Sequence, residues 1–427
     1  MQSFGNPMVK RNGASSYKWA VVAMLWSICV LNYADRQAIF SIFPKLQSEF
    51  GFDKVQLGLI GSAFMWVYAA GAPFAGVAGD LLRRKDLILG GCLFWSAITC
   101  MTGWCSKLWH FVAVRAAEGF GETFYFPASM SLLSDYHSAK TRSRAMSLHQ
   151  SSVYIGTILG SWLGAWFAER HGWRVGFYFF GATGMVLALV LYRFLKEPAR
   201  AAQDVLDPSE KISLREGLAA VFRTPSALLI MAAFVGANFV ATIFLTWTPT
   251  FLVEKFGFRL TTAGLGGTVF IHLASAFSVP LAGWLADQLA TRYRGGRMMV
   301  QIGGLVLGAG FVFLVGATKT VSVLLTTMVF FGICKGFYDS NIFAAIYDVV
   351  HPRVRGSAAG IMNTVGWGGG ALGPLAVGWF SQHGGGATEM ENMSHAISYC
   401  SAIYLVSATL LVLSICFLPK ARKNVGN

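Results

Sequence analysis

Twelve apolar stretches, each long enough to cross a lipid bilayer, set the strongest limit on how this chain can fold. A hydrocarbon core about 30 Å thick needs about 20 consecutive, mostly apolar residues in a helix. The sequence has 427 residues, and the stretches that meet this length lie at 18–43, 57–81, 86–105, 108–133, 142–168, 173–195, 226–252, 261–289, 297–317, 321–349, 355–381 and 394–418. They predict an all-α integral membrane protein with twelve transmembrane helices.

Composition excludes several other classes of protein. Hydrophobic residues make up 55% of the chain and charged residues only 13%, which is too apolar for one soluble core with an ordinary surface. The seven cysteines are scattered, without the spacing of a zinc site or a disulfide framework. A phosphate-binding loop is absent, as are the motifs of metal-dependent or nucleophilic catalysis. We therefore expect neither an enzyme nor a nucleotide-driven pump, and neither a cofactor nor a metal.

The placement of charge predicts how the chain is oriented in the membrane. The net charge of +14 is spread in small clusters between apolar stretches, a pattern typical of a polytopic membrane protein and not of a nucleic-acid-binding protein. Most lysines and arginines lie on the side that holds both termini and the loops after even-numbered helices, so this side is expected to be cytoplasmic. Residues 1–17 are polar, and we expect no cleavable signal peptide. The expected location is a bacterial inner membrane.

The twelve stretches divide into two sets of six. The polar segment between them predicts five regions: a cytoplasmic tail at 1–17, a six-helix bundle at 18–195, a cytoplasmic loop at 196–225, a second bundle at 226–418 and a tail at 419–427.

The two sets of six also repeat in sequence. Residues 134–150 align with 347–363, so that Asp135 falls on Asp348 and Arg142 falls on Arg355. Parallel repeats of this kind are typical of transporters with a central site and alternating access.

These features resemble the major facilitator superfamily. The resemblance rests on the twelve helices, the repeat, and the G-x-x-x-D segments "GVAGD" and "GWLAD" at corresponding positions in the two halves. The loop "GVAGDLLRRK" departs from the family pattern at Leu81 and Arg83. "LNYADRQAI" and "RAAEGFGETFYFPAS" resemble two branches, the organic anion:proton symporters, which include galactonate and hexuronate carriers, and the spinster-like lipid transporters. The resemblance implies proton-coupling positions at Asp35 and Glu122.

Ionisable residues inside the predicted helices point to the mechanism independently of the resemblance. Each costs at least about 2.5 kcal/mol to insert, so such residues are rare and usually functional. A rise of about 1.5 Å per residue places Asp35 and Arg115 at similar depth, which allows them to pair across the bundle. Arg115 also shares a helix face with Glu118 and Glu122. The whole set is Asp35, Arg36, Arg115, Glu118, Glu122, Lys335 and Asp339.

Some of these residues have a purely structural alternative. Glu118 can be only the structural partner of Arg115, and Lys335 and Asp339 can neutralise each other instead of contacting a ligand. His149 is interpreted as a polar packing group.

The sequence predicts a proton-coupled secondary active transporter of a small organic anion, such as a sugar acid, that works by alternating access. Its expected partners are protons, a small-molecule substrate and the lipid bilayer, without nucleic acid, and a monomer is expected. Arginine suits a carboxylate because it binds bidentately. The alternative substrate is a lysolipid or another amphipathic molecule, and a non-transporting membrane sensor is a further alternative.

Candidate substrate-binding residues are Arg36, Tyr68, Arg115, Glu118, Lys335, Tyr338, Asp339, Asn341 and Asn363. Candidate residues of a cytoplasmic gate are Asp80, Arg84, Lys85, Asp135, Arg142, Asp287, Asp348 and Arg355.

Overall fold

The computed structural model describes residues 11–198, 219–351 and 354–418, and within these ranges the regular elements are helices. The first half of the chain contributes α1 (Arg11–Ser41), α2 (Phe43–Phe50), α3 (Lys54–Leu81), α4 (Arg84–Thr102), α5 (Leu108–Glu122), α6 (Tyr125–Tyr136), α7 (Ala139–Arg170) and α8 (Trp173–Phe194). The second contributes α10 (Pro225–Phe256), α11 (Leu260–Arg292), α12 (Gly296–Ala317), α13 (Val321–Asp339), α14 (Ile342–Val349), α15 (Arg355–Gly370), α16 (Leu372–His383) and α17 (Glu389–Cys416).

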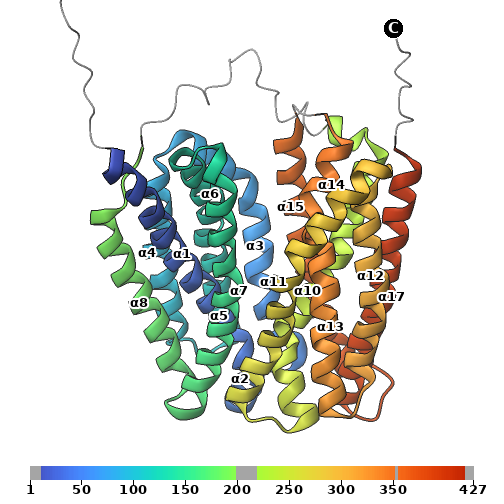
Figure 1. Ribbon diagram of the computed structural model, residues 1–427. Coiled ribbons are helices and arrows are strands. Elements are labelled where there is room, and N and C mark those ends of the chain that lie inside the picture. Colours follow the sequence, from blue (N-terminus) through green and yellow to red (C-terminus); the bar gives the residue numbers. More distant parts are fainter. Residues whose placement is uncertain (1–10, 199–218, 352–353, 419–427) are drawn as a thin grey trace, which may run out of the picture.

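The helices form two bundles that lie side by side (Figure 1). We call α1–α8 the N half and α10–α17 the C half. Helix α1 begins and α17 ends on the same side of the molecule, which is at the top of Figure 1 and is called the terminal face. The opposite side, where α2 lies, is called the far face. Among the described residues, eight helices are each long and apolar enough to cross a membrane.

Three of the predicted spans are interrupted by a short break. The span predicted at 108–133 is divided into α5 and α6, the span at 321–349 into α13 and α14, and the span at 355–381 into α15 and α16. The first two breaks occupy corresponding places in the two halves, because α5 ends at Glu122 and α13 ends at Asp339. Broken helices inside a membrane expose backbone groups, which is tolerated where they are buried in protein or line a cavity.

Small residues let the two halves approach closely near the far face. A Cβ atom at Gly264 of α11 would lie 2.5 Å from the carbonyl oxygen of Ser161 in α7. A Cβ atom at Gly58 of α3 would lie 2.6 Å from the carbonyl oxygen of Pro374 in α16. These glycines are therefore needed for the contacts of α7 with α11 and of α3 with α16.

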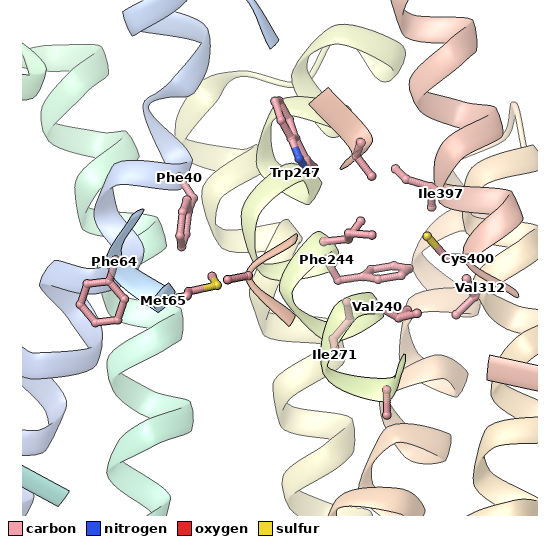
Figure 2. Packing of buried hydrophobic residues seen from close by; sticks show 14 of the residues in the cluster. Phe40, Phe64, Met65, Val240, Phe244, Trp247, Ile271, Val312, Ile397 and Cys400 are labelled. Atoms are coloured by element: carbon pink, nitrogen blue, oxygen red, sulfur yellow. The ribbon is translucent and has the colours of Figure 1, made fainter. Parts of the chain in front are cut away.

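The largest buried apolar cluster runs through both halves. Figure 2 shows Phe40, Phe64 and Met65 of the N half on one side of this cluster and Phe244 and Trp247 of the C half on the other. The rings of Phe43 and Trp247 meet across the boundary with centroids 5.6 Å apart. Two smaller clusters each lie within one half.

Candidate functional site

Two buried ion pairs lie where α1 and α5 face each other in the N half. The Nε atom of Arg36 donates to Oε2 of Glu122 over 2.9 Å, and its Nη2 atom contacts the same oxygen. Nη1 of Arg115 donates to Oε2 of Glu118 over 2.5 Å. The side chain of Arg36 is 10% exposed and those of the other three are at most 2% exposed. Four charges are thus held in pairs away from solvent, and Arg115 and Glu118 are in direct contact.

Asp35 does not make the contact that was predicted from its depth in the membrane. Its carboxylate accepts a hydrogen bond from the backbone N–H of Arg36 over 2.8 Å, and its Oδ2 atom lies 3.3 Å from the hydroxyl of Thr99 in α4. Asp35 does not form the expected ion pair with Arg115. The guanidinium of Arg115 instead binds Glu118, one turn away on the same helix. Thr99 was not predicted from the sequence.

The three acids form one carboxylate cluster. An oxygen of Asp35, of Glu118 and of Glu122 all lie within 4.8 Å of one another. The Thr99 hydroxyl also lies 3.3 Å from Oε1 of Glu118 and so stands between two of the acids, while it donates its hydrogen to the backbone oxygen of Trp95 over 2.9 Å. Oxygen ligands at this spacing suit a small cation. With two guanidiniums beside three carboxylates, full ionisation would leave one negative charge unbalanced, which a proton or another monovalent cation can neutralise.

Aromatic rings enclose the two arginines. The ring centroid of Phe64 in α3 lies 4.6 Å from the Arg36 guanidinium carbon and 4.7 Å from that of Arg115. Tyr33 and Tyr68 stack on Arg36 at 4.5 and 5.2 Å. Cation–π contacts of this kind stabilise a desolvated cation, by about 2 kcal/mol each where water is excluded. The predicted site residue Tyr68 therefore lies directly beside Arg36.

Several polar atoms of this site are buried without a partner in the described part of the chain. These atoms are Nη1 of Arg36, Nε of Arg115 and Oε1 of Glu122. A buried polar atom without a hydrogen bond costs about 1–3 kcal/mol. The two arginines therefore retain donor atoms that a further anion can use after a change of side-chain conformation.

The charged pair of the C half is less enclosed. Lys335 and Asp339 are paired one turn apart on α13, and their side chains are 20% and 26% exposed. The structure thus bears out their mutual neutralisation, and it leaves contact with a ligand open because both side chains reach solvent-accessible space. The pair stands just before the α13–α14 break, as Glu118 and Glu122 stand just before the α5–α6 break.

The other predicted substrate-binding residues of the C half do not form one cluster. Tyr338 is buried, and its backbone oxygen accepts a hydrogen bond from Gln301. The side-chain amide of Asn341 donates to the hydroxyl of Ser340 over 2.7 Å. Asn363 is half-buried on α15.

Two aromatic contacts join the halves near the middle of the molecule. The rings of Tyr68 in α3 and Trp367 in α15 meet with centroids 5.7 Å apart. The rings of Tyr154 in α7 and His272 in α11 meet with centroids 6.1 Å apart. Sequence analysis missed Trp367, Tyr154 and His272. The available signal was a polar ring at the middle of a long apolar helix.

A cross-half contact that we call the far-face latch consists of Glu169, Arg259 and Thr261. Glu169 at the end of α7 accepts hydrogen bonds from Nε and Nη2 of Arg259 over 2.9 and 2.8 Å. It also accepts from the backbone N–H and the hydroxyl of Thr261, in the first turn of α11, over 3.0 and 2.5 Å. The hydrogen bonds from Thr261, followed by that from Arg259, lower the pKa of Glu169 to about 2. Lys54 and Glu254 form a second cross-half ion pair nearby.

The ion pairs described at the terminal face each lie within one half. Arg84 pairs with Asp135 and with Glu197, and Nζ of Lys85 donates to the backbone oxygen of Tyr192. In the C half the corresponding pairs centre on a residue that sequence analysis missed, because Arg297 binds both Asp287 and Asp348.

The other gate candidates make backbone contacts or cannot be placed. Nε of Arg142 donates to the oxygen of His137, and Nε of Arg355 donates to that of Tyr347. The side chain of Asp80 lies outside the described part of the chain. The charge pairs that join the two halves among the described residues thus lie at the far face, whereas those at the terminal face join segments within one half.

Comparison with known proteins gives consistent results. The model of the Major Facilitator Superfamily matches residues 25–374 and 254–427. The chain is 27% identical over 383 residues to the chloroplastic sodium-dependent phosphate transport protein 1 of Arabidopsis thaliana, covering 86% of this chain and 74% of that protein. It is 26% identical over 426 residues to the D-galactonate transporter of Escherichia coli, covering 93% and 95%.

A solved structure shares the fold. It is that of a bacterial homolog to the human lysosomal transporter Spinster, in an inward-facing and unoccupied conformation. The TM-score is 0.83 at 20% sequence identity, and the match covers 94% of this chain and 98% of the other.

Proposed function

The chain belongs to the Major Facilitator Superfamily, with its fold of twelve membrane helices, and we propose that it is a proton-coupled secondary active transporter of a small hydroxylated organic anion such as a sugar acid. The observation that carries this proposal is the buried carboxylate cluster of Asp35, Glu118 and Glu122 with its two arginines. Buried charge of this kind is costly to maintain in a membrane protein and usually marks an ion or substrate path.

Proton coupling follows from the way in which the arginines are held. Glu122 binds Arg36 through Oε2, and Asp35 lies against the backbone of the same residue. When Glu122 takes up a proton, its attraction for the guanidinium weakens and the guanidinium becomes available to a substrate carboxylate. Each ligand then favours the state that the other needs, so the binding of proton and substrate is mutually reinforcing.

The chemistry of the arginines indicates the substrate class. A guanidinium presents a planar fork that matches a carboxylate with two parallel hydrogen bonds. Arg36 and Arg115 each have one buried nitrogen donor, Nη1 and Nε respectively, without a hydrogen-bond partner in the described part of the chain. The D-galactonate transporter to which the chain is similar is named for such a hydroxylated carboxylate, and this supports the same class here.

Alternating access is supported by the cross-half contacts. The far-face latch and the Lys54–Glu254 pair hold the halves together on one side, which is the arrangement expected of a state that opens toward the terminal face. The distribution of lysine and arginine supports a cytoplasmic terminal face, with both termini in the cytoplasm. We further propose that the protein acts as a monomer in a bacterial inner membrane.

A second candidate substrate is a lysolipid or a similar amphipathic molecule. An apolar groove of about 360 Å³ lies between α11 and α13, lined by Ala274, Phe277, Ser278, Leu281, Val329, Ile333 and Phe337. Its apolar lining suits an acyl chain. The buried arginines require an anionic group, which is the carboxylate of an organic anion or the phosphate of a lysophospholipid, so they do not by themselves separate the two candidates.

A thermal-stability screen separates the two candidates. A ligand that binds the folded state raises the unfolding midpoint, so purified protein is heated with sugar acids such as galactonate and glucuronate or with lysophospholipids. We expect a sugar acid to raise the midpoint, more at pH 5.5 than at pH 8. The Arg115→Ala variant should lose this shift, while a variant of the exposed Arg83 keeps it. A shift with lysophospholipids alone would establish the second candidate instead.

A further inference from the structure

His272 lies at the centre of the molecule, where three helices from both halves meet. It belongs to α11, which packs against α7 of the N half and against α13. Its ring meets that of Tyr154 on α7 at 6.1 Å. Lys335 of α13 interacts electrostatically with both His272 and Tyr154, and Asp339 interacts with Tyr154. Four polar side chains outside the carboxylate cluster therefore gather at one place.

The hydrogen bond of His272 fixes which ring nitrogen is available. Nδ1 lies 2.9 Å from the backbone oxygen of Thr268, and a carbonyl oxygen can only accept, so Nδ1 carries the hydrogen. In the neutral ring Nε2 is then an acceptor. Nε2 has no hydrogen-bond partner within the described ranges, and the side chain is half-buried. Nε2 is thus a hydrogen-bond acceptor that none of the described residues uses.

His272 lies on the terminal-face side of the close contact between the two halves at Gly264 and Ser161. Gly264 lies two turns nearer the far face on the same helix and packs against the backbone of Ser161. At about 1.5 Å per residue, His272 is about 12 Å from that contact. On the other side of the centre, Tyr68 and Trp367 form a matching contact between the halves.

The two halves offer complementary chemistry to a ligand. The arginines of the N half have only donors, which bind an anion and cannot accept from a hydroxyl. In the C half, Lys335 is already paired with Asp339. A hydroxyl group needs an acceptor for its hydrogen, and Nε2 of His272 supplies one that none of the described side chains uses.

We propose that His272 is a specificity-determining residue whose Nε2 atom accepts a hydrogen bond from a hydroxyl group of the substrate. The substrate then spans the boundary, with its carboxylate at the arginines of the N half and its hydroxylated part at His272. This inference rests on the proposed function and names the residue that recognises the hydroxyl groups of the substrate. An anion without hydroxyl groups would leave the acceptor of His272 unsatisfied.

Calorimetric binding of two anions to the purified full chain tests the proposal. Galactonate and hexanoate are both six-carbon carboxylates, but only galactonate carries hydroxyl groups. We expect the wild-type protein to prefer galactonate. His272→Phe keeps an aromatic ring against Tyr154 and removes the acceptor, and it should weaken galactonate binding about tenfold without changing hexanoate binding. His272→Gln, whose amide oxygen is an acceptor at a similar reach, should restore much of the loss.

A matched control exists elsewhere in the chain. Nδ1 of His383 on α16 makes the same contact with the backbone four residues earlier, at Trp379, over 3.0 Å, but the side chain is exposed. His383→Phe should leave the binding of both anions unchanged. Thermal unfolding confirms that each variant is folded, and His272→Leu replaces His272→Phe if the latter is not.

The outcomes separate this inference from the proposed function. If His272→Phe keeps the wild-type preference for galactonate, or weakens both anions equally, His272 is not a specificity determinant, while the proposed function stands. If the wild-type protein binds neither galactonate nor any other sugar acid, the proposed function fails and this inference fails with it.

Discussion

The far-face latch is expected to set how often the protein opens toward the far face. Glu169 accepts hydrogen bonds from Arg259, whose side chain is 78% exposed, and from Thr261 at the start of α11. An exposed ion pair contributes about 0.5 kcal/mol, and an acceptor at the N-terminus of a helix contributes about 1 kcal/mol. The latch therefore stabilises the closed far face by about 1.5 kcal/mol, which is roughly a tenfold effect on the equilibrium.

Distances between spin labels measure this equilibrium. Labels carried on unnatural amino acids at Ser48 of the N half and Lys319 of the C half report on the far face, because both residues are exposed there. We expect Glu169→Ala to increase the ratio of long to short distances about tenfold relative to the wild-type protein.

A control variant removes a similar contact within one half. Glu49 binds Arg174 over 2.7 Å and Trp173 over 2.7 Å, all in the N half, so Glu49→Ala should leave the distances unchanged. Equal distance distributions for Glu169→Ala and the wild-type protein would refute the role of the latch, as would an equal shift in the control.

The latch should not respond to pH in the physiological range. The hydrogen bonds from Thr261 and Arg259 lower the pKa of Glu169 from 4.5 to about 2. A group whose pKa is lowered in the closed state contributes stability above its ordinary pKa and loses it as the pH falls toward the lowered value. The difference in distances between Glu169→Ala and the wild-type protein should thus be constant from pH 6 to pH 8. Any pH dependence of opening in this range must then come from other groups.

Variants at four further positions, with Gly283 as a control, test the site and the packing between the halves. Glu122→Gln should abolish accumulation driven by a pH gradient and leave exchange of substrate across the membrane largely intact, as measured in liposomes. Arg115→Ala should abolish substrate binding measured by calorimetry, and Arg115→Lys should restore it poorly because the planar fork is lost. Asp35→Asn removes a negative charge beside Arg36, so it should keep substrate binding and reduce its dependence on pH without abolishing it, because Glu122 still takes up a proton. Gly264→Val adds a Cβ atom 2.5 Å from the oxygen of Ser161, so it should destabilise the closed far face by about 1–3 kcal/mol, whereas Gly283→Val, on the same helix with open space around it, should not.

The helices and the buried charges could be predicted from the sequence because both depend on local pattern. Long apolar stretches appear in the structure as helices, and the intramembrane Asp, Glu, Lys and Arg residues of the site were recognised by their type alone, whereas His272 was not. The breaks after Glu122 and Asp339 were not predicted, because hydrophobicity is continuous across them. Which residues pair could be predicted only in part. Depth along a helix follows from residue number, but the direction of a long side chain does not, and for this reason Arg115 was expected to reach Asp35.

Contacts between the halves were beyond sequence reasoning for a different reason. The contacts of Tyr154 with His272 and of Glu169 with Arg259 depend on how two bundles are placed against each other. Periodicity describes one helix at a time and contains no information about this placement. The residues at the far face were visible only as charges near helix ends, and Arg297 appeared as one of many basic residues on the terminal face.

The central claim is that protons drive the accumulation of an organic anion through the carboxylate cluster. Uptake of radiolabelled galactonate into liposomes that contain the purified protein, with the lumen buffered at pH 8 and the outside at pH 6, tests this claim most directly. The account predicts that galactonate accumulates above its external concentration, that a protonophore abolishes the accumulation, and that Glu122→Gln shows only equilibration. Accumulation that persists with the protonophore, or that is unchanged in Glu122→Gln, would contradict the account.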